Sequence, residues 1–402
     1  MFDKFYTLPF KTQFLLIMGV TFGVSLLLTP LVRLLAFKIG AVDSPNARRI
    51  NTKVMPTAGG IAIFLSFVLS SLIFLPPLVR TVLPMGPWHA DRAVLHYFDY
   101  IWPVVVAGGI VLLTGLIDDI REIRPLTKVG GITLGFLVIW FFTDIHFSNF
   151  KIPFHGPMLI FPPWVSFFVT FVWIVLITNA FNIIDGLDGL ASGVSLISLV
   201  TLGITSYFFL PVPNVFLPIT IFALVAAILG FFPYNYHPAI IYLGDTGALF
   251  IGFMLSILSL QGLKNATAVA TVTPLIILGV PLTDSVVATI RRMLNKQKFY
   301  MPDKSHLHHR LLQMGFTQRG AVFVIYGIAS TFATISIILN ISSRLGGILL
   351  VIALLFGLEI FIELVGIWGA GRNPLMNVLK FIGNSGYRAE ILEQRRERKQ
   401  KK

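Results

Sequence analysis

Long apolar runs alternate with short polar segments along most of the chain. Each run is close to the roughly 20 residues that an α-helix needs to cross a bilayer. The pattern predicts an all-α polytopic membrane protein with about eleven transmembrane helices. We expect the helices near residues 12–36, 57–75, 101–117, 129–143, 164–181, 187–209, 214–231, 246–262, 268–292, 320–340 and 345–368.

The first run is too long for a signal peptide and lacks a small-residue cleavage site, so we expect it to remain as a helix. Proline-rich residues 76–100 and residues 144–163 are expected outside the membrane, the second segment as turns or a short hairpin. A single transmembrane bundle is predicted over residues 1–368, followed by a basic tail over residues 369–402.

Composition agrees with a location in lipid. Hydrophobic residues make up 55% of the chain and charged residues 12%, and the mean hydropathy is +0.83. A water-soluble surface needs more polar residues than this. The chain has no cysteine, which excludes disulfides, thiolate metal sites and cysteine nucleophiles.

The net charge of +13 is unevenly placed. If the helices alternate from an outside N-terminus, one side holds 24 of the 31 Lys and Arg residues, in residues 33–57, 118–130, 288–319 and the tail from 369. Short basic loops favour the cytoplasm, so we expect an outside N-terminus and a cytoplasmic C-terminus in a multi-pass cell-membrane protein. A basic tail beside anionic lipid headgroups explains the charge without nucleic-acid binding.

Acidic residues are costly in an apolar protein unless a site uses them, and the chain has only 18. Seven lie in or at the ends of the segments expected to be cytoplasmic, each inside a cluster that contains glycine, proline or histidine: Asp43, Asp118, Asp119, Asp185, Asp188, Asp245 and Asp303. We therefore predict that the chemistry takes place at the cytoplasmic face.

The first cluster is the pair Asp118-Asp119, followed by Arg121, Arg124 and Lys128. Adjacent carboxylates repel, so a nearby cation or a raised pKa is needed to hold both in a confined site. A solvated helix end explains the pair equally well when it is taken alone.

The second cluster places Asn182, Asp185 and Asp188 three residues apart with interleaved glycines. This spacing puts the polar groups on one side, and the glycines let a ligand approach the backbone. The array suits Mg²⁺ with a pyrophosphate or a hydroxyl-rich nucleoside. A turn without a ligand would explain the glycines, but it would not explain two acids beside the membrane.

The third cluster runs from Asn235 to Gly247. Gly244-Asp245-Thr246-Gly247 opens an apolar run, so its backbone amides could face phosphate while Asp245 holds a metal and Tyr242 stacks on a base. Gly-Asp-Thr-Gly is also a common turn sequence.

The fourth cluster contains His306, His308, His309 and Arg310. The adjacent cations and the lack of cysteine favour phosphate or sugar binding over zinc. A solvated His-rich loop remains an alternative. Asp284, Glu359 and Glu363, all embedded in apolar runs, are expected to pair with basic groups at the cytoplasmic rim rather than to form a proton relay.

The first inner loop, residues 42–60, precedes these clusters. Taken in order, the loop and the clusters resemble the polyprenyl-phosphate N-acetylhexosamine-1-phosphate transferase family, from about residue 40 to about residue 315. Asp-Ser-Pro-Asn-Ala-Arg-Arg at 43–49 and His-Leu-His-His-Arg-Leu-Leu at 306–312 resemble the bacterial branch that takes UDP-N-acetylglucosamine, as in wall teichoic acid and enterobacterial common antigen synthesis. The branch that uses UDP-muramyl-pentapeptide usually carries three consecutive histidines, which this chain lacks.

The resemblance implies a role for each cluster. Asp245 with Asn182 would bind Mg²⁺ on the pyrophosphate, and Mn²⁺ could replace it. Asp118 and Asp119 would act on the lipid phosphate. Asp185 would also be a catalytic residue. Asp188 and Asn235 would contact uridine beside Tyr242. His306, His308, His309 and Arg310 would recognise the sugar and the phosphates. Lys53 and Thr57 would bind substrate, although their loop carries Asn51 and Val54 where many relatives have His and Pro.

We therefore expect the bundle to transfer N-acetylglucosamine 1-phosphate from UDP-N-acetylglucosamine to undecaprenyl phosphate, releasing UMP, as the first membrane step of cell-wall polymer synthesis such as that of teichoic acid. Direct attack by the lipid phosphate, with Asp118 assisting its deprotonation, is expected, and double displacement through a phospho-aspartate is the rival route. The expected partners are these two substrates and membrane lipid, and the protein could also form a homodimer.

The same chemistry with another UDP-N-acetylhexosamine is the alternative function. A transporter would place its polar residues at the bilayer midplane rather than at one rim. A CDP-alcohol phosphotransferase would need an Arg after Asp-Gly-x-x-Ala, and Asp188-Gly189-Leu190-Ala191-Ser192 lacks it.

Overall fold

The computed structural model describes residues 8–44, 54–82, 87–151, 158–209, 215–263, 268–294, 306–366 and 374–383, together with 391 and 393. The chain forms two compact units. The first contains residues 1–282 and 318–342, and the second contains residues 283–317 and 343–402. Each unit is described by itself.

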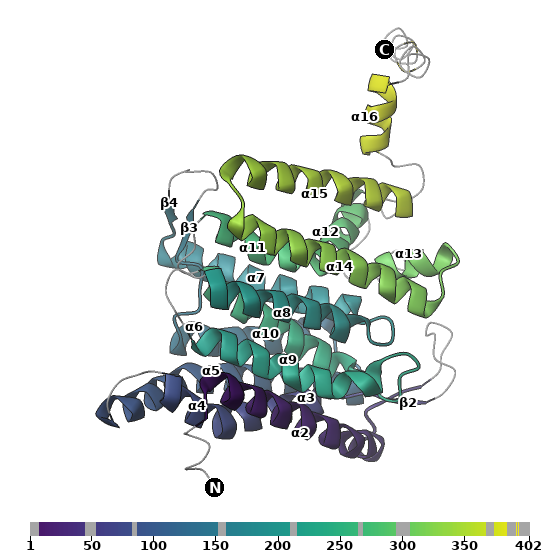
Figure 1. Cartoon of the computed structure of the whole chain (residues 1–402). Coiled ribbons are helices and arrows are strands. Elements are labelled where there is room, and N and C mark those ends of the chain that lie inside the picture. The colour runs from purple at the N-terminus through teal and green to yellow at the C-terminus, as the bar shows by residue number, and fades with distance from the viewer. Residues whose placement is uncertain are drawn as a thin grey trace. The chain divides into compact units, whose positions relative to one another are not determined.

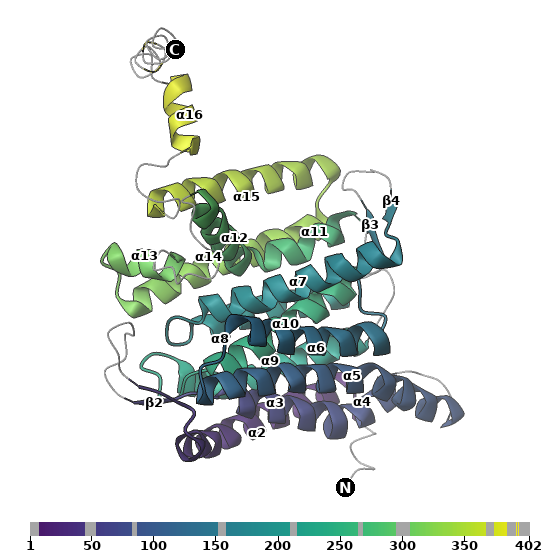
Figure 2. The ribbon, with the colours of Figure 1, turned by 180° about the vertical axis from the view of Figure 1, so that it is seen from behind.

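Helices build almost all of the first unit, and α7 and α5 run alongside α10 in both views (Figure 1, Figure 2). The helices are α2 (Phe10–Ile39), α3 (Gly60–Leu69), the π-helix η1 (Ser70–Phe74), α4 (Leu75–Val82), α5 (Pro87–Ile120), α6 (Pro125–Phe142), α7 (Pro163–Ile184), α8 (Leu190–Phe209), α9 (Phe216–Asn235), α10 (Gly244–Leu263), α11 (Ala268–Ile277) and α14 (Gln318–Ile341).

Among the described residues, ten helices are long and apolar enough to cross a membrane. This confirms the prediction of an all-α polytopic membrane protein. The predicted helix at 268–292 is wrong as a single element, because α11 ends at Ile277 and α12 (Gly279–Leu294) starts after a turn at Leu278. The physical reason is the Gly279 and Pro281 pair: glycine favours a break, and proline has no N–H to bond the carbonyl four residues before it.

The expected irregular connection at 76–100 is also largely helical. Pro76 and Pro77 lie in the first turn of α4, directly after the π-helix η1, and α5 begins at Pro87. With 34 residues, α5 is about 50 Å long and exceeds the roughly 30 Å hydrocarbon core. It is therefore longer than a helix needs to be to cross the hydrocarbon core.

The centre of the first unit is α10. It packs against α3, α5, α7, α8 and α9. Its residues Leu249, Phe250, Phe253, Met254 and Leu255 are fully buried, which fits a helix that is apolar on all sides and enclosed by other helices. The start of α10 is thus held in place from several directions.

Two small antiparallel sheets join the helices. In the first, β1 (Val42–Asp43) pairs with β2 (Met55–Pro56). The Tyr242 N–H donates a hydrogen bond to the Pro56 carbonyl at 2.9 Å. The second, β3 (Asn149–Lys151) with β4 (Met158–Ile160), confirms the hairpin expected within 144–163. The first sheet ties the first inner loop to the segment that leads into α10.

The second unit contains most of α12 with α13 (Leu307–Gln313), α15 (Arg344–Val365) and α16 (Pro374–Gly383). Ser343 caps α15 by accepting a hydrogen bond from the Gly346 N–H at 3.3 Å. Glu363 was expected to pair with a basic group, but both of its oxygens accept backbone N–H groups at the start of α16, from Leu375 and from Met376. Its negative charge suits the positive end of that helix dipole.

Candidate active site

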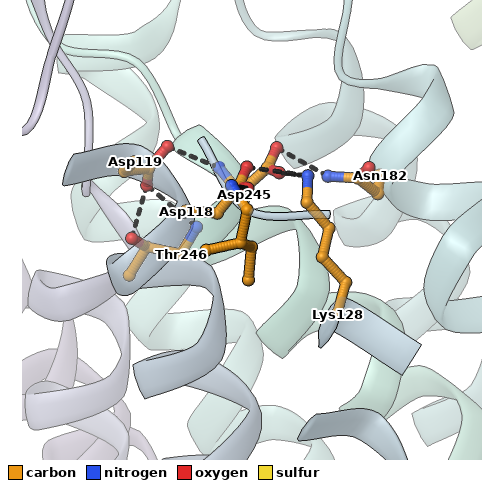
Figure 3. A network of polar contacts seen from close by, with 7 residues as sticks. Asp118, Asp119, Lys128, Asn182, Asp245 and Thr246 are labelled. Carbon is orange, nitrogen blue, oxygen red and sulfur yellow. Dashed lines mark hydrogen bonds and ion pairs between the residues drawn. The ribbon is translucent and has the colours of Figure 1, made fainter. Parts of the chain in front are cut away.

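Four helix ends meet in the first unit and bring polar side chains together (Figure 3). Asp118 lies at the end of α5, Lys128 in the first turns of α6, Asn182 near the end of α7 and Asp245 in the first turn of α10. Helix ends carry backbone groups without helical partners, so they attract polar side chains and ligands. Three of the predicted clusters therefore converge on one site.

Lys128 lies between two of these carboxylates. Its Nζ is 2.7 Å from Asp118 Oδ2 and also contacts Asp245 Oδ2. Asn182 Nδ2 donates to Asp245 Oδ1 at 2.7 Å, and the Ile123 N–H donates to Asp118 Oδ1 at 2.9 Å. The Lys128 ammonium group is thus a cation beside the acidic pair, one of the two conditions under which adjacent carboxylates can be held in a confined site.

Asp119 faces a different direction from its neighbour (Figure 3). Its Oδ1 accepts the Asp245 N–H at 3.0 Å, and its Oδ2 accepts the Thr246 N–H at 3.0 Å and the Thr246 hydroxyl. The carboxylate of α5 thus caps the first turn of α10, more than one hundred residues further along the chain.

Glycines allow the close approach of α5 to α10. A Cβ on Gly115 would lie 2.4 Å from the Asp245 carbonyl oxygen. A Cβ on Gly244 would lie 2.5 Å from Asp119 Oδ2, and Gly244 has a φ of +70°, which disfavours other residues. The glycine-rich sequence around Asp245 is therefore required by packing as well as by any ligand.

The turn after α7 carries Asp185 and Asp188. Asp188 Oδ2 lies 2.7 Å from His237 Nδ1 and accepts the Ala239 N–H at 3.1 Å, so this carboxylate braces the loop after α9. Burial raises the pKa of the Asp185 carboxyl well above its usual value, and the nearby charges of Asp245, Asp119 and Asp188 raise it further. Asp185 therefore belongs to the same acidic cluster.

Tyr242 and Asn235 occupy the loop beside this turn. Burial raises the pKa of Tyr242, and the charges of Asp188 and Asp185 act in the same direction. Asn235 is 3% exposed; its Oδ1 accepts from the Ser192 hydroxyl at 2.7 Å and its Nδ2 donates to the Ile241 carbonyl at 3.2 Å. The Asn235 side chain thus has hydrogen-bond partners within the protein, in addition to the uridine contact that was predicted for it.

The predicted residues of the first inner loop are only partly described. Thr57 is buried, and its hydroxyl has no hydrogen-bond partner among the residues that the structure describes. Its N–H donates to the Ala41 carbonyl at 2.9 Å. Lys53 lies outside the described residues, as does Asp303.

The histidines form their own cluster in the second unit. Asp284 accepts the Leu307 N–H at 2.9 Å and lies 3.1 Å from His306 Nδ1, as expected for an acid that pairs with a basic group. The His308 ring lies 4.2 Å from that of His309, centroid to centroid. Burial lowers the pKa of His308 to about 3, and the neighbouring His309 acts in the same direction.

Two buried side-chain nitrogens in this cluster have no hydrogen-bond partner among the residues that the structure describes. Within the described part of the chain, neither His308 Nδ1 nor Arg310 Nε makes a hydrogen bond, while Arg310 Nη1 donates to Gln313 Oε1 at 3.5 Å. Buried polar groups without partners are costly. An anionic ligand such as a phosphate would satisfy both.

The acidic cluster fits a divalent cation. Asp118, Asp119 and Asp245 with Lys128 carry a formal charge of −2, from three carboxylates and one ammonium. Within the described ranges, no three acidic or histidine side chains form a ready-made metal cage. Mg²⁺ is commonly held by one or two carboxylates and by substrate phosphates rather than by such a cage. Asp245 has such a carboxylate, and the side-chain amide of Asn182, which contacts it, carries an oxygen that a hard cation can also accept as a ligand.

Sequence reasoning missed several residues that shape the site. Lys128 was noted only as one of three basic residues after the acidic pair, and nothing local distinguishes it from Arg121 or Arg124. His237 and Thr246 stand inside recognised motifs, but their partners Asp188 and Asp119 lie far away in sequence. Only the tertiary structure assigns these pairs.

Comparison with known proteins places this site in a family. A family profile described as "Glycosyl transferase family 4" matches residues 101–263, which include Asp118, Asn182 and Asp245. The chain is 38% identical over 366 residues to a "Probable undecaprenyl-phosphate N-acetylglucosaminyl 1-phosphate transferase" of Bacillus subtilis (strain 168), covering 90% of this chain and 96% of the relative.

Two further relatives come from other bacterial groups. A "Decaprenyl-phosphate N-acetylglucosaminephosphotransferase" of Mycolicibacterium smegmatis is 32% identical over 73% of this chain and 74% of its own length. An "Undecaprenyl-phosphate alpha-N-acetylglucosaminyl 1-phosphate transferase" of Salmonella typhi is 29% identical over 76% of this chain and 78% of its own length. From its similarity over nearly full length to such a relative, this chain belongs to glycosyl transferase family 4, the polyprenyl-phosphate N-acetylhexosamine-1-phosphate transferases.

Proposed function

We propose that this enzyme transfers N-acetylglucosamine 1-phosphate from UDP-N-acetylglucosamine to undecaprenyl phosphate and releases UMP. The names of the relatives support the transferred group and the acceptor. The structural observation that carries the proposal is the convergence of Asp118, Lys128, Asn182 and Asp245 at four helix ends. Such a site can hold a cation and a diphosphate next to the membrane.

The reaction needs no protein nucleophile, because the lipid phosphate already carries a negative charge. One of its oxygens forms a bond to the phosphorus of the sugar phosphate, and the bond from that phosphorus to the oxygen of the departing UMP breaks. Positioning and charge neutralisation carry most of such a transfer. In this proposal Asp118 accepts the remaining proton of the lipid phosphate.

Asp245 and Asn182 would hold Mg²⁺, or Mn²⁺ in its place. When bound, the ion supplies positive charge that neutralises the diphosphate and the departing UMP. Lys128 lies within contact distance of Asp245 and can add a second positive charge there. The negative formal charge of the cluster supports this assignment.

The motif residues that the family resemblance names are assigned to substrate recognition in this proposal. In the first unit, Tyr242 would stack on uracil, and Asp188 and Asn235 would contact the uridine or hold the loops around it. His306, His309 and Arg310 would bind the sugar and its phosphates, as the family resemblance implies. His308 would take part as a neutral imidazole, because its pKa is near 3.

We place the active site at the cytoplasmic face of the cell membrane, where UDP-sugars are available. The uneven distribution of Lys and Arg, 24 of 31 on one side, supports this placement. The product would be the first lipid-linked intermediate of a cell-wall polymer such as teichoic acid.

An assay of the purified protein with undecaprenyl phosphate and a panel of UDP-sugars tests this proposal. We expect lipid-linked product and UMP with UDP-N-acetylglucosamine. If another UDP-sugar reacts and UDP-N-acetylglucosamine does not, the assignment of the donor is wrong. Trapping a covalent sugar-phosphate enzyme with labelled donor and no lipid would overturn the direct route.

A further inference from the structure

The two adjacent aspartates make different contacts. Asp118 faces Lys128, whereas Asp119 directs both of its oxygens to the start of α10. Asp119 accepts three hydrogen bonds, two from backbone N–H groups and one from the Thr246 hydroxyl. An ionised carboxylate has about four acceptor sites, so most of the capacity of Asp119 is already in use.

These contacts hold the peptide groups on either side of Asp245. Asp119 binds the Asp245 N–H from one side. Gly115, one helical turn earlier in α5, approaches the Asp245 carbonyl so closely that a Cβ would lie 2.4 Å from it. Gly244 leaves the space in which the Asp119 carboxylate lies, 2.5 Å from where its own Cβ would be. The backbone of Asp245 is therefore fixed by α5.

The position of that backbone decides where the Asp245 side chain points. Its two oxygens reach Asn182 from α7 and Lys128 from α6, so a small rotation of the first turn of α10 would separate them from both partners. A negative charge at a helix N-terminus also stabilises that turn through the helix dipole. Asp119 provides both the cap and the charge.

We propose that Asp119 is a positioning residue that sets the metal-binding geometry of Asp245, and that Asp118 alone of the pair acts on the lipid phosphate. This inference rests on the function proposed above and assigns separate tasks to two acids that the sequence presents as one unit. It predicts that the two aspartates respond differently to the same conservative substitution.

The test compares Asp119→Asn, Asp119→Ala, Asp118→Asn and Thr246→Val in the full-length detergent-purified protein. Two quantities are measured: Mn²⁺ affinity by electron paramagnetic resonance, and the pH profile of kcat in the transfer assay. Size-exclusion profile and Tm show that each variant is folded.

Asparagine keeps one oxygen that can accept an N–H group at the start of α10, whereas its NH₂ group cannot accept the second one. We therefore expect Asp119→Asn to keep Mn²⁺ affinity and kcat within about tenfold of the wild type, with the acidic limb of the pH profile in place. Asp119→Ala should weaken Mn²⁺ binding by more than tenfold, and Thr246→Val should weaken it only slightly. Asp118→Asn should lose about 10²-fold or more in kcat, as expected for a general base, with Mn²⁺ affinity little changed.

Two results would overturn the inference. One is an Asp119→Asn variant that is as inactive as Asp118→Asn, or that loses the acidic limb of the profile. The other is an Asp119→Ala variant that is folded and binds Mn²⁺ like the wild type. If Asp119→Ala does not fold, Asp119→Asn and Thr246→Val still decide the question. If the wild type transfers no sugar phosphate, the proposed function fails, while the Mn²⁺ measurements continue to test the role of Asp119.

Discussion

At the scale of single residues, the site depends on how charges are compensated. Lys128 contacts both Asp118 and Asp245, so it reduces the repulsion between two carboxylates that would otherwise separate. In a partly buried setting such pairs are costly to break, because the remaining charge loses its partner. The acids are thus held near one another by the chain itself, close to the arrangement that a bound cation would require.

His308 gives a prediction at the same scale. Its pKa is near 3 in the folded protein and about 6.5 when unfolded, so the unfolded state binds more protons between these values. Its contribution to stability is therefore complete above pH 6.5 and is lost as the pH falls toward 3. Between pH 7 and pH 5.5 this loss is about 1 kcal/mol.

We expect His308→Gln to show a smaller fall in Tm from pH 7 to pH 5.5 than the wild type in detergent. The exposed His96 offers a matched control, and His96→Gln should follow the wild type. Equal falls in Tm for the wild type and His308→Gln would show that His308 is not held neutral.

At the scale of elements, the fold works by bringing helix ends together at close range. The end of α5 and the start of α10 approach each other at Gly115, where no side chain separates them. Adding atoms to such a contact costs about 1–3 kcal/mol through strain. The same contact orients Asp245, so packing and activity should respond together.

Gly115→Ala should therefore lower Tm and reduce kcat by tenfold or more, since its Cβ would push against the Asp245 carbonyl. Gly130 in α6 is the matched control, because a Cβ there would meet nothing within 4 Å. Gly130→Ala should leave kcat unchanged and Tm equal or slightly higher, as alanine favours the helix. Full activity and unchanged Tm in Gly115→Ala would contradict the described packing.

The sequence predicts most helices because apolar runs of membrane length are a strong signal. It fails where the signal is ambiguous. Residues 268–292 are apolar enough for one helix, yet Gly279 and Pro281 divide them into two. The early start of α5 is not predicted, because the residues near 90 are polar. The motifs locate Asp118, Asn182 and Asp245, but the cap from Asp119 to Thr246 spans 127 residues and has no local signal.

At the scale of the whole molecule, topology decides whether the acidic cluster faces the cytoplasm. The distribution of basic residues predicts an outside N-terminus and a cytoplasmic C-terminus. The natural absence of cysteine makes a direct measurement simple, since every introduced thiol is the only one in the chain.

A cysteine at position 400 should react with a membrane-impermeant maleimide only after the cells are opened. A cysteine at position 155 serves as the outer control and should react in intact cells. The reverse pattern would place the acidic cluster on the outside, away from the supply of UDP-sugars.

We propose that transfer depends on a metal held at Asp245. The most direct measurement is the formation of lipid-linked N-acetylglucosamine phosphate from UDP-N-acetylglucosamine and undecaprenyl phosphate, with and without Mg²⁺, by the wild type and by Asp245→Asn. We predict product only for the wild type with Mg²⁺, with a loss of at least about 10³-fold in Asp245→Asn although the variant still inserts into the membrane. Near-normal turnover by Asp245→Asn, or by the wild type with all divalent cations chelated, would contradict the account.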